Sequence, residues 1–388
     1  MIKFLNLKKK KQIKIYFICQ YIQGYNKICD VIEKMKSDPK IDVKVIAFPN
    51  DIYMFPKNNE YDFWHSKFGD ITINSVEGDK WFNLEKEKPD YVFIQRPYDN
   101  YLPSEYSVEN IKKYTKICYI PYGFELINLR DVAMPDFFVK NVSLFFCTQS
   151  EEYNYCKHII DNTNDIFERK VYNLGYPSLY NIIKKINISK SAYKKIERKT
   201  NLNVLWTPRW TTDYKLCKTS FFDYKDDMVN YMKNQQNINF VFRPHPLAFN
   251  NFIQTGLMTK KQVDSYLKNY KKSNMVYDCS SDYYDTFIDS DVLITDFSSI
   301  IIEYFLLNKP IIYCYKKIDN MTMLMKEMID CFYCVDNFDE IKNTLENLQK
   351  GIDPLKNKRE KLINKILENY KEDVSVKIVN EIKKDFYN

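Results

Sequence analysis

Glycine is scarce in this sequence: only 7 of its 388 residues are glycine, beside 32 tyrosines and 26 phenylalanines. Together with the abundance of lysine, asparagine and isoleucine, this balance indicates a codon bias, so we infer no chemistry from the tyrosines. Long hydrophobic runs are also missing, since no segment reaches the roughly 18 apolar residues that would span a bilayer. The start of the chain has no cleavable signal pattern either. We therefore expect a cytoplasmic protein.

Paired metal-ligand motifs are missing as well. The ten cysteines are scattered, and several fall in apolar runs, where they are expected to act as small core residues in a reducing compartment. Cys331 and Cys334 form a lone CxxC without a second pair or a nearby histidine. Asp289 and Asp291 form an Asp-x-Asp pair, but this pair precedes a predicted strand instead of following one. We expect neither a metal site nor a cofactor.

Positive charge is unevenly distributed along the chain, whose formal net charge is +7. Met1–Lys14 holds six lysines and no acid, and Lys184–Lys199 holds seven basic residues against Glu197 alone. Such runs are either solvated surface or attracted to anionic lipid head groups, where each basic residue contributes about 1 kcal/mol. Binding of nucleic acid is not expected, because neither a recognition helix nor an aromatic RNA-binding sheet is indicated.

Short apolar runs alternate with amphipathic helical segments through the whole chain, which predicts two α/β domains with parallel sheets. A length of 388 residues is typical of two domains. The basic stretch Lys184–Lys199 is interpreted as their connection. The predicted strands are Ile13–Ile18, Val43–Phe48, Tyr91–Ile94, Lys116–Ile120, Ser143–Cys147, Lys170–Asn173, Asn203–Trp206, Ile238–Phe242, Asn274–Asp278, Asp291–Thr295, Ile311–Tyr315 and Phe332–Val335.

The stretch Asp291–Tyr315 predicts a strand, a tight polar loop, a helix over Ile300–Leu307 and a second strand. Ser298 or Ser299 can cap this helix, which would leave hydroxyls and backbone N–H groups at the carboxyl edge of the sheet. That edge is where an anionic phosphate binds in open α/β sheets.

Three polar corners are predicted to converge on this edge in the second half: Thr207–Trp210, Arg243–Pro246 and Asp296–Ser299. Arg209 and Arg243 offer planar forks to phosphate oxygens, and serines with backbone N–H groups complete a cradle. His245, fixed between two prolines, can stabilise or protonate a leaving phosphate. The set predicts a pyrophosphate site, with Asp296 among its binding residues.

Other candidates lie nearby or in the first half. Glu303, about one and a half turns into the helix, could reach a ribose hydroxyl. His65 and His158 are interpreted as structural. The loops Gln95–Tyr101 and Pro121–Glu125 leave the carboxyl ends of two predicted strands, and they are therefore the acceptor-side candidates.

Several of these motifs resemble the CDP-glycerol glycerophosphotransferase family, which builds teichoic acids and phosphate-containing capsules. They are RPHP at 243–246, TDFSS at 295–299 with Glu303 and NKPIIYCY after it, and TPRW at 207–210. The resemblance implies a GT-B fold, in which two Rossmann-like domains face a cleft and the final helix crosses back to the first domain. It implies that Arg243 and His245 contact the donor pyrophosphate, that Ser298 and Ser299 bind its phosphates, and that Glu303 stands near the ribose.

With the resemblance, the chain divides into an N-terminal acceptor domain at residues 1–190, a nucleotide-donor domain at 200–355 and C-terminal helices at 356–388. The family carries a second essential histidine in a loop of the first domain, and the corresponding place here, Tyr119–Gly123, has none. The base that activates the acceptor is therefore open between Glu125 and Asp99, with Tyr122 and Gly123 as binding candidates beside them.

The leading hypothesis is a metal-independent transferase that moves glycerol phosphate, or a related polyol phosphate, from a CDP-activated donor to a hydroxyl of a glycan or lipid-linked glycan precursor, with release of CMP. One alternative keeps the fold and uses a CMP- or UDP-sugar in capsule or lipopolysaccharide synthesis. Another is a non-catalytic nucleotide- or glycan-binding subunit. The resemblance further implies peripheral work at the anionic inner face of the cytoplasmic membrane.

Overall fold

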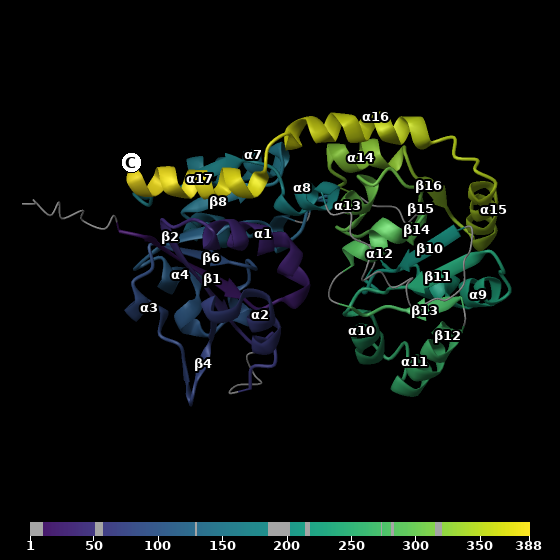
Figure 1. Cartoon of the computed structure of the whole chain (residues 1–388), viewed down its shortest axis with the longest axis horizontal. Helices are drawn as coiled ribbons and strands as arrows, with labels where there is room; N and C mark the ends of the chain where they lie inside the picture. Colours follow the sequence, from purple (N-terminus) through teal and green to yellow (C-terminus); the bar gives the residue numbers. More distant parts are fainter. Residues whose placement is uncertain are drawn as a thin grey trace, which may run out of the picture. The chain divides into compact units, whose positions relative to one another are not determined.

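The computed structural model describes residues 11–50, 57–128, 130–184, 202–213, 218–272, 274–280, 283–314 and 320–388. The chain divides into two compact units (Figure 1). The first unit comprises Met1–Gly123, Leu129–Ser178 and Glu372–Asn388, and the second comprises Phe124–Asn128 and Leu179–Lys371. The predicted boundary between residues 190 and 200 falls outside the described residues and stays a prediction.

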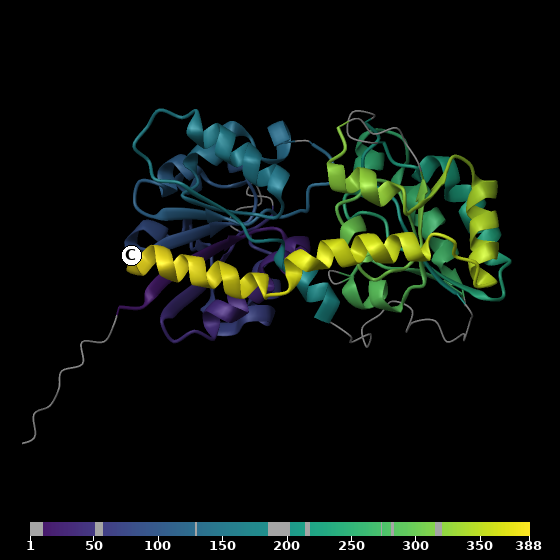
Figure 2. The same cartoon turned by 90° about the horizontal axis from the view of Figure 1, so that it is seen from above.

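The first unit is built on a seven-stranded sheet with the strand order β3-β2-β1-β6-β7-β8-β9, in which every neighbouring pair is parallel. Its strands are β1 (Ile13–Cys19), β2 (Ile41–Ala47), β3 (Thr72–Asn74), β6 (Tyr91–Ile94), β7 (Lys116–Tyr119), β8 (Leu144–Cys147) and β9 (Lys170–Asn173). The inner strands β1, β6, β7 and β8 are mostly apolar and almost entirely buried, as parallel strands between two helical layers require, whereas the edge strand β9 is only partly buried. Helices lie on both sides of the sheet (Figure 2).

The helices of this part of the chain are α1 (Tyr25–Lys36), α2 (Tyr61–Phe68), α3 (Leu84–Glu87), α4 (Val108–Ile111), α5 (Arg130–Ala133), α6 (Asp136–Asn141), α7 (Ser150–Asp161) and α8 (Pro177–Lys184). One predicted helix, Lys80–Glu87, is wrong in its first half. There Lys80–Trp81 (β5) pairs with Val76–Glu77 (β4) as a small antiparallel hairpin.

The last helix of the chain, α17 (Val374–Tyr387), belongs to the first unit and packs beside α1 (Figure 1). Its Asp385 carboxylate is buried and accepts hydrogen bonds from the Tyr91 hydroxyl at 2.6 Å, Lys116 Nζ at 2.8 Å and Lys170 Nζ at 2.6 Å. Burial alone would raise the pKa of Asp385, but these donors bring it below its ordinary value. The helix end is thereby fixed to the starts of three strands.

The second unit is built on another seven-stranded sheet, with the order β12-β13-β11-β10-β14-β15-β16. All neighbours are parallel except β12 and β13, which are antiparallel. The strands are β10 (Leu202–Thr207), β11 (Ile238–Phe242), β12 (Lys271–Lys272), β13 (Met275–Tyr277), β14 (Val292–Thr295), β15 (Ile311–Cys314) and β16 (Tyr333–Val335). All six strands predicted here are found to within two residues, apart from Tyr315, which lies outside the described residues.

The helices of the second unit are α9 (Phe221–Lys233), α10 (Ala248–Gln254), α11 (Lys260–Leu267), α12 (Tyr284–Asp289), α13 (Ile301–Phe305), α14 (Met323–Ile329), α15 (Phe338–Gln349) and α16 (Lys356–Leu367). Its core is strongly aromatic: Trp206 lies within 6.2 Å of Phe221, Phe240 and Phe242, measured between ring centroids. Each such ring pair stabilises the fold by about 0.5–1.5 kcal/mol beyond the contribution of its buried apolar area.

The helix after β14 is shorter than predicted. It spans Ile301–Phe305, and Asn308 leaves the helical conformation with a φ of 55°. Its N-cap position is Ile300, without a side-chain cap, so the predicted capping by Ser298 or Ser299 is wrong.

The predicted C-terminal helices divide between the units. Residues up to Lys371, including α16, belong to the second unit, and only the segment from Glu372 belongs to the first. Arg359 of α16 is fully buried and pairs with Asp353 at 2.7 Å, which fixes this helix within its unit.

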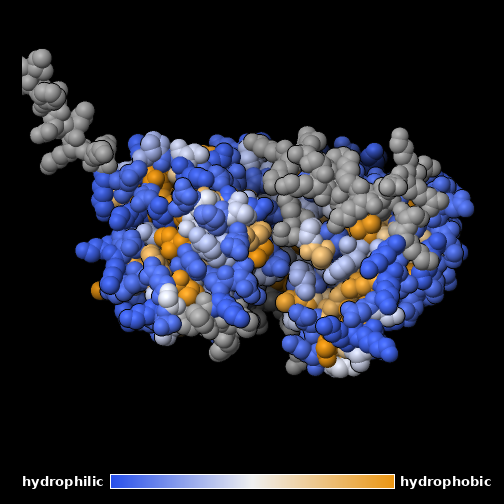
Figure 3. All heavy atoms as spheres, turned by 60° about the horizontal axis from the view of Figure 1, so that its bottom comes forward, coloured by the Kyte–Doolittle hydropathy of each residue, from blue (hydrophilic) through white to orange (hydrophobic). Residues whose placement is uncertain are grey.

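No helix in the described ranges combines the length and the apolar character that crossing a membrane requires. Hydrophilic residues cover most of the face drawn in Figure 3, with smaller hydrophobic patches between them.

Candidate functional site

Three adjacent strands of the second unit, β11, β10 and β14, end in the three polar corners that the sequence singled out. Hydrogen bonds join the corners directly. The N–H of His245 donates to the carbonyl of Pro208 at 3.1 Å, and the N–H of Arg209 donates to Asp296 Oδ1 at 2.7 Å. The predicted convergence of the corners on one sheet edge is therefore present.

Asp296 organises this edge. Its side chain is buried, and Oδ2 accepts from the Ser220 N–H at 2.7 Å, the Ser220 hydroxyl at 3.0 Å and the Thr219 hydroxyl at 3.2 Å. Burial raises the pKa of Asp296, although these donors oppose the shift. The carboxylate is thus occupied by donors from the loop after β10 and from the segment before α9, and it positions the corners instead of facing solvent. Ser220 and Thr219 were missed, because nothing in their local sequence marks them as partners of a distant acid.

The Arg209 guanidinium extends from the first corner over the third. Its Nη1 donates to the carbonyl of Phe297 at 2.9 Å, and its carbon lies 5.0 Å from the centroid of the Phe297 ring. The side chain is partly exposed. A planar cation held in this way is suited to donate hydrogen bonds to phosphate oxygens from its open side.

His245 is held in one orientation. Its Nδ1 accepts a hydrogen bond from the N–H of Leu247 at 3.2 Å, and its ring lies 6.1 Å from that of Trp210. Because Nδ1 is the acceptor, the neutral ring carries its proton on Nε2. Burial, aided by the charge of Arg209, lowers the pKa of His245 to about 4. At neutral pH the residue is therefore a neutral hydrogen-bond donor through Nε2.

Ser298 and Ser299 complete the accessible part of the edge. Ser298 is partly exposed and Ser299 is exposed. The Ser298 hydroxyl lies 3.5 Å from the N–H of Ile300, at the limit of a hydrogen bond. Both hydroxyls are thus placed where a ligand at this edge could be hydrogen-bonded.

The Arg243 guanidinium, which was expected from the sequence to bind phosphate, donates hydrogen bonds to other residues of the protein. Its Nη1 donates to Asp278 Oδ2 at 2.6 Å and to the Ser280 hydroxyl at 3.1 Å, and Nη2 donates to the Ser280 carbonyl at 2.6 Å. Asp278 and Ser280 follow β13, the next strand of the same edge, and were not singled out beforehand. The position of Asp278 at the end of a predicted strand was the signal that could have identified it.

Glu303 lies inside the unit. Its side chain is fully buried and accepts hydrogen bonds from the hydroxyls of Tyr283 at 2.5 Å and Tyr284 at 3.4 Å. Each carboxylate oxygen has a tyrosine partner, so a contact with a ribose would require the helix end to rearrange.

The acceptor-side candidates lie in two different units. Asp99, in the first unit, accepts from the N–H of Val108 at 3.2 Å through both oxygens, and burial raises its pKa. The hydroxyl of Tyr122 shares a hydrogen bond of 2.8 Å with the hydroxyl of Tyr98. Gly123 is the last residue of this segment of the first unit.

Glu125 belongs to the second unit, in the segment Phe124–Asn128. This segment pairs with the chain near α14, because Asn128 N–H donates to Asn320 O at 2.8 Å and Thr322 N–H donates to Leu126 O at 3.0 Å. The predicted loop Pro121–Glu125 is therefore divided, and Glu125 and Asp99 are not brought together within one unit.

Within the part of the chain that the structure describes, no three His, Cys, Asp or Glu side chains are grouped so that they could hold a metal ion. Metal independence stays a prediction.

The sequence matches the family described as CDP-Glycerol:Poly(glycerophosphate) glycerophosphotransferase over residues 147–384, which is more than half of the chain. The chain belongs to this family. The region of this glycerophosphotransferase-family chain that matches the family contains all three converging corners, at 207–210, 243–246 and 295–299. A comparison with curated proteins found no match.

Solved structures similar to this glycerophosphotransferase-family chain share its fold. A UDP-N-acetylglucosamine 2-epimerase is 13% identical with a TM-score of 0.62, covering 97% of each chain. The UDP-GlcNAc 2-epimerase from Neisseria meningitidis bound to UDP-GlcNAc is 16% identical with a TM-score of 0.61, covering 96% of this chain and 100% of that one. The wall teichoic acid polymerase TagF is 14% identical with a TM-score of 0.59, covering 97% and 89%. The predicted GT-B class, two Rossmann-like domains with a helical C-terminal tail, is confirmed.

Proposed function

We propose that this protein transfers glycerol phosphate from CDP-glycerol to a hydroxyl of a teichoic-acid-type or capsule glycan precursor and releases CMP. Family membership supports the donor and the reaction. The observation that carries the proposal is the junction of the three corners, in which Asp296 and Pro208 tie Arg209 and His245 to one sheet edge. Such an edge is the usual binding place for phosphates in open α/β sheets.

In the proposed reaction, the acceptor oxygen attacks the β-phosphorus of CDP-glycerol. The bond from this phosphorus to the bridging oxygen breaks, and CMP leaves with the electron pair. Arg209 and the Nε2–H of His245 stabilise the charge that develops on the departing phosphate, and the hydroxyls of Ser298 and Ser299 bind its oxygens. Arg243 contributes by holding the loop after β13 through Asp278.

The acceptor proton must pass to a base. Asp99 and Glu125 stay the proposed candidates, with Tyr122 and Gly123 beside them. Burial raises the pKa of Asp99, which makes this carboxylate a better proton acceptor than an exposed aspartate. Glu303 is proposed to stabilise the end of α13 through its tyrosine partners instead of binding ribose directly.

A nucleotide panel tests the proposed donor. CDP-glycerol and CMP at about 100 times their Kd are expected to stabilise the protein by about 2.7 kcal/mol, because each binds the folded state alone. Thermal unfolding with each ligand, with and without EDTA, measures this shift. The shift should persist in EDTA, should be lost in Arg209→Ala, which keeps the backbone bond to Asp296, and should be kept in the charge-matched control Lys225→Ala on the surface of α9.

The panel also decides between donors. The similarity to UDP-GlcNAc 2-epimerases favours a UDP-sugar as the second candidate. Stabilisation by UDP and not by CMP would replace the proposed donor with that class. Stabilisation by no nucleotide would favour a non-catalytic glycan-binding role.

We also propose peripheral association with the anionic inner face of the cytoplasmic membrane, where a lipid-linked acceptor would be met. The two basic segments of the sequence support this, although residues 1–10 and 185–200 lie outside the described residues. Lys11 and Lys14 of the first segment contact Asp90 and the carbonyl of Glu87.

Co-sedimentation with vesicles tests the association. Binding to vesicles with anionic lipid is expected at low salt and should be released at high salt, since the attraction is screened over about 8 Å at physiological ionic strength. Deletion of residues 1–10 should weaken it while leaving the CMP-induced shift unchanged. Equal binding to neutral vesicles would contradict the electrostatic mechanism.

A further inference from the structure

A second polar edge lies within the first unit, at the ends of the adjacent strands β1, β6 and β7. Gln20 and Tyr21 follow β1, Arg96 follows β6, and Tyr122 follows β7. Because all three strands are parallel, their carboxyl ends meet on one edge, as in the second unit.

Arg96 is the cation at the centre of this edge. Its Nη2 donates to Gln20 Oε1 at 3.1 Å, and its guanidinium carbon lies 4.6 Å from the ring centroid of Tyr101 and 5.5 Å from that of Tyr21. The Nε atom is buried and has no hydrogen-bond partner in the described part of the chain. Burial lowers the pKa of Arg96, because it destabilises the charged guanidinium. Among the described residues, only tyrosines and the Gln20 amide stabilise this charge.

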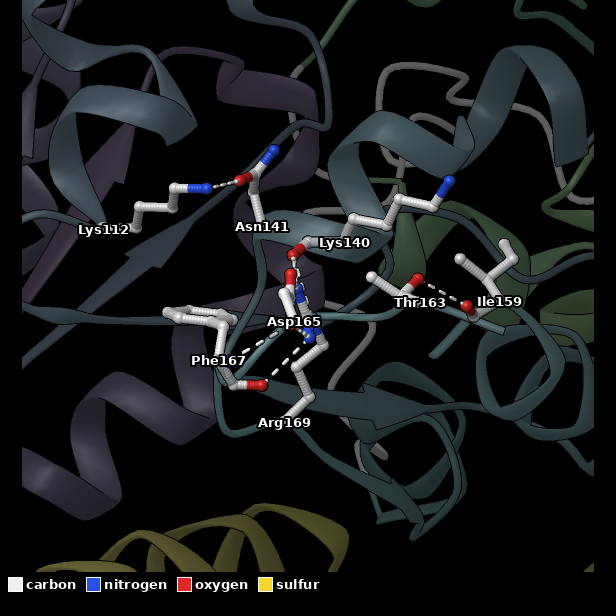
Figure 4. Close-up of polar contacts among 8 residues, drawn as sticks. All are labelled: Lys112, Lys140, Asn141, Ile159, Thr163, Asp165, Phe167 and Arg169. Carbon is white, nitrogen blue, oxygen red and sulfur yellow. Dashed lines mark hydrogen bonds and ion pairs between the residues drawn. The ribbon is translucent and has the colours of Figure 1, made fainter. Parts of the chain in front are cut away.

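Four other described arginines have a carboxylate partner, whereas Arg96 has none among the described residues. These ion pairs are Arg130–Glu151, Arg169–Asp165, Arg243–Asp278 and Arg359–Asp353. Figure 4 shows the arrangement around Arg169, whose guanidinium donates to Asp165 and to the carbonyls of Lys140 and Phe167. A half-buried guanidinium without an anion is uncommon, because an unpaired buried charge destabilises the fold.

Hydrogen bonds join the segments around Arg96. Gln95 Oε1 accepts from the N–H groups of both Gln20 and Tyr21 at 2.8 Å, and its Nε2 donates to the Tyr21 carbonyl at 2.9 Å. Gly24 makes this possible, since a Cβ there would lie 2.7 Å from Gln95 Nε2. Gln20 in turn donates to the carbonyl of Tyr101. The backbones after β1 and β6 are therefore hydrogen-bonded to each other through the side chain of Gln95.

We propose that Arg96, framed by Gln20, Tyr21, Tyr101 and Tyr122, forms an anion site that binds a phosphodiester group of the acceptor. This inference rests on the proposed function, in which the first unit receives the acceptor. Arg96 supplies a fork of N–H donors and the tyrosine hydroxyls supply further donors, which matches the oxygens of a phosphodiester. The site makes Arg96 a residue that selects phosphate-bearing acceptors over neutral glycans.

Calorimetric titration with glycerophosphoglycerol, a soluble phosphodiester, tests the site on the full chain. Charge-assisted hydrogen bonds contribute about 1.5–3 kcal/mol, so Arg96→Gln is expected to weaken binding by about 10- to 100-fold. Arg96→Lys, which keeps the charge and loses the fork, should show an intermediate loss. The control Lys113→Gln removes an exposed cation of the same unit and should bind as the wild type does.

Titration of CDP-glycerol in the same variants separates this inference from the proposed function. Arg96→Gln should leave CDP-glycerol affinity unchanged and raise the KM of a phosphodiester acceptor more than it lowers kcat. Unchanged phosphodiester binding in Arg96→Gln would overturn the site, and an equal loss of CDP-glycerol affinity would mean that Arg96 contacts the donor instead. If the wild type does not bind CDP-glycerol, the proposed function fails, while the phosphodiester titration still decides the role of Arg96.

Discussion

Replacing His245 by alanine is expected to lower kcat by about 100- to 1000-fold, the loss typical of removing one donor that stabilises transition-state charge. The melting temperature should change little, because the ring is partly exposed and its one hydrogen bond is to the N–H of Leu247. Transfer from labelled CDP-glycerol, measured beside thermal unfolding, gives both quantities. His158→Ala, at an exposed position on α7, is the matched control and should keep full activity.

The orientation of His245 sharpens this experiment. Since Nδ1 accepts from Leu247 and Nε2 carries the proton, glutamine can place an amide N–H near the Nε2 position, whereas asparagine cannot reach it. His245→Gln should therefore keep more activity than His245→Asn. Equal loss in both variants would favour proton transfer over hydrogen bonding as the role of the imidazole.

The pH dependence follows from the same group. The pKa of His245 is lowered from 6.5 to about 4, so the neutral ring persists well below pH 6 in the free enzyme. The profile of kcat/KM should show no acid limb near pH 6.5 from this residue. Because the unfolded chain takes up the proton first, the stability that the neutral ring contributes is full above pH 6.5 and is lost as the pH falls toward 4.

The second large effect is expected at Asp296. Asp296→Asn should destabilise the second unit by about 3 kcal/mol, the cost typical of breaking a buried hydrogen-bonded charge. The amide would place N–H groups against the donors of Arg209, Ser220 or Thr219, all of which now donate to the carboxylate. Denaturant unfolding measures the loss, and CMP titration should show weakened binding because the corners lose their junction.

Asp264→Asn on α11 is the control for this variant. Asp264 is exposed, and its replacement by asparagine removes the same charge from the same unit. If Asp296→Asn unfolded at the same denaturant concentration as this control, the organising role of Asp296 would be wrong.

Most strands were predictable because their signal is local. Ile238–Phe242 is a short run with strong β-forming residues, bounded by a polar residue before it and Arg243-Pro244 after it, and it forms β11 with the predicted bounds. The hairpin at Lys80–Trp81 was missed because a strand of two residues is too short to show the alternation of apolar and polar residues that predicts a strand. The helix α13 ends early because Asn308 adopts a left-handed conformation, a choice that the apolar pattern of Ile300–Leu307 does not reveal.

The candidate site was predictable in its place and only partly in its contacts. Parallel strands bring their carboxyl ends to one edge, so Arg209, His245 and Ser298 could be grouped from the sequence. The carboxylates of Asp296 and Glu303 accept hydrogen bonds from Ser220 and Tyr283, which lie in other segments of the sequence. Because these partners are not neighbours in the sequence, the sequence alone could not distinguish an acidic residue that positions a loop from one that faces a ligand.

The products formed from CDP-glycerol test the central claim most directly. The protein is incubated with CDP-glycerol and an acceptor that ends in a free glycerol hydroxyl, and the released nucleotides are separated by ion exchange. Attack at the β-phosphorus predicts CMP, formed in equal amount to the glycerol phosphate gained by the acceptor, and formation of both products about 100- to 1000-fold more slowly with His245→Ala. Release of CDP, which would mean that the link between the diphosphate and glycerol breaks instead of the pyrophosphate bond, or turnover of a UDP-sugar in place of CDP-glycerol, would contradict the account.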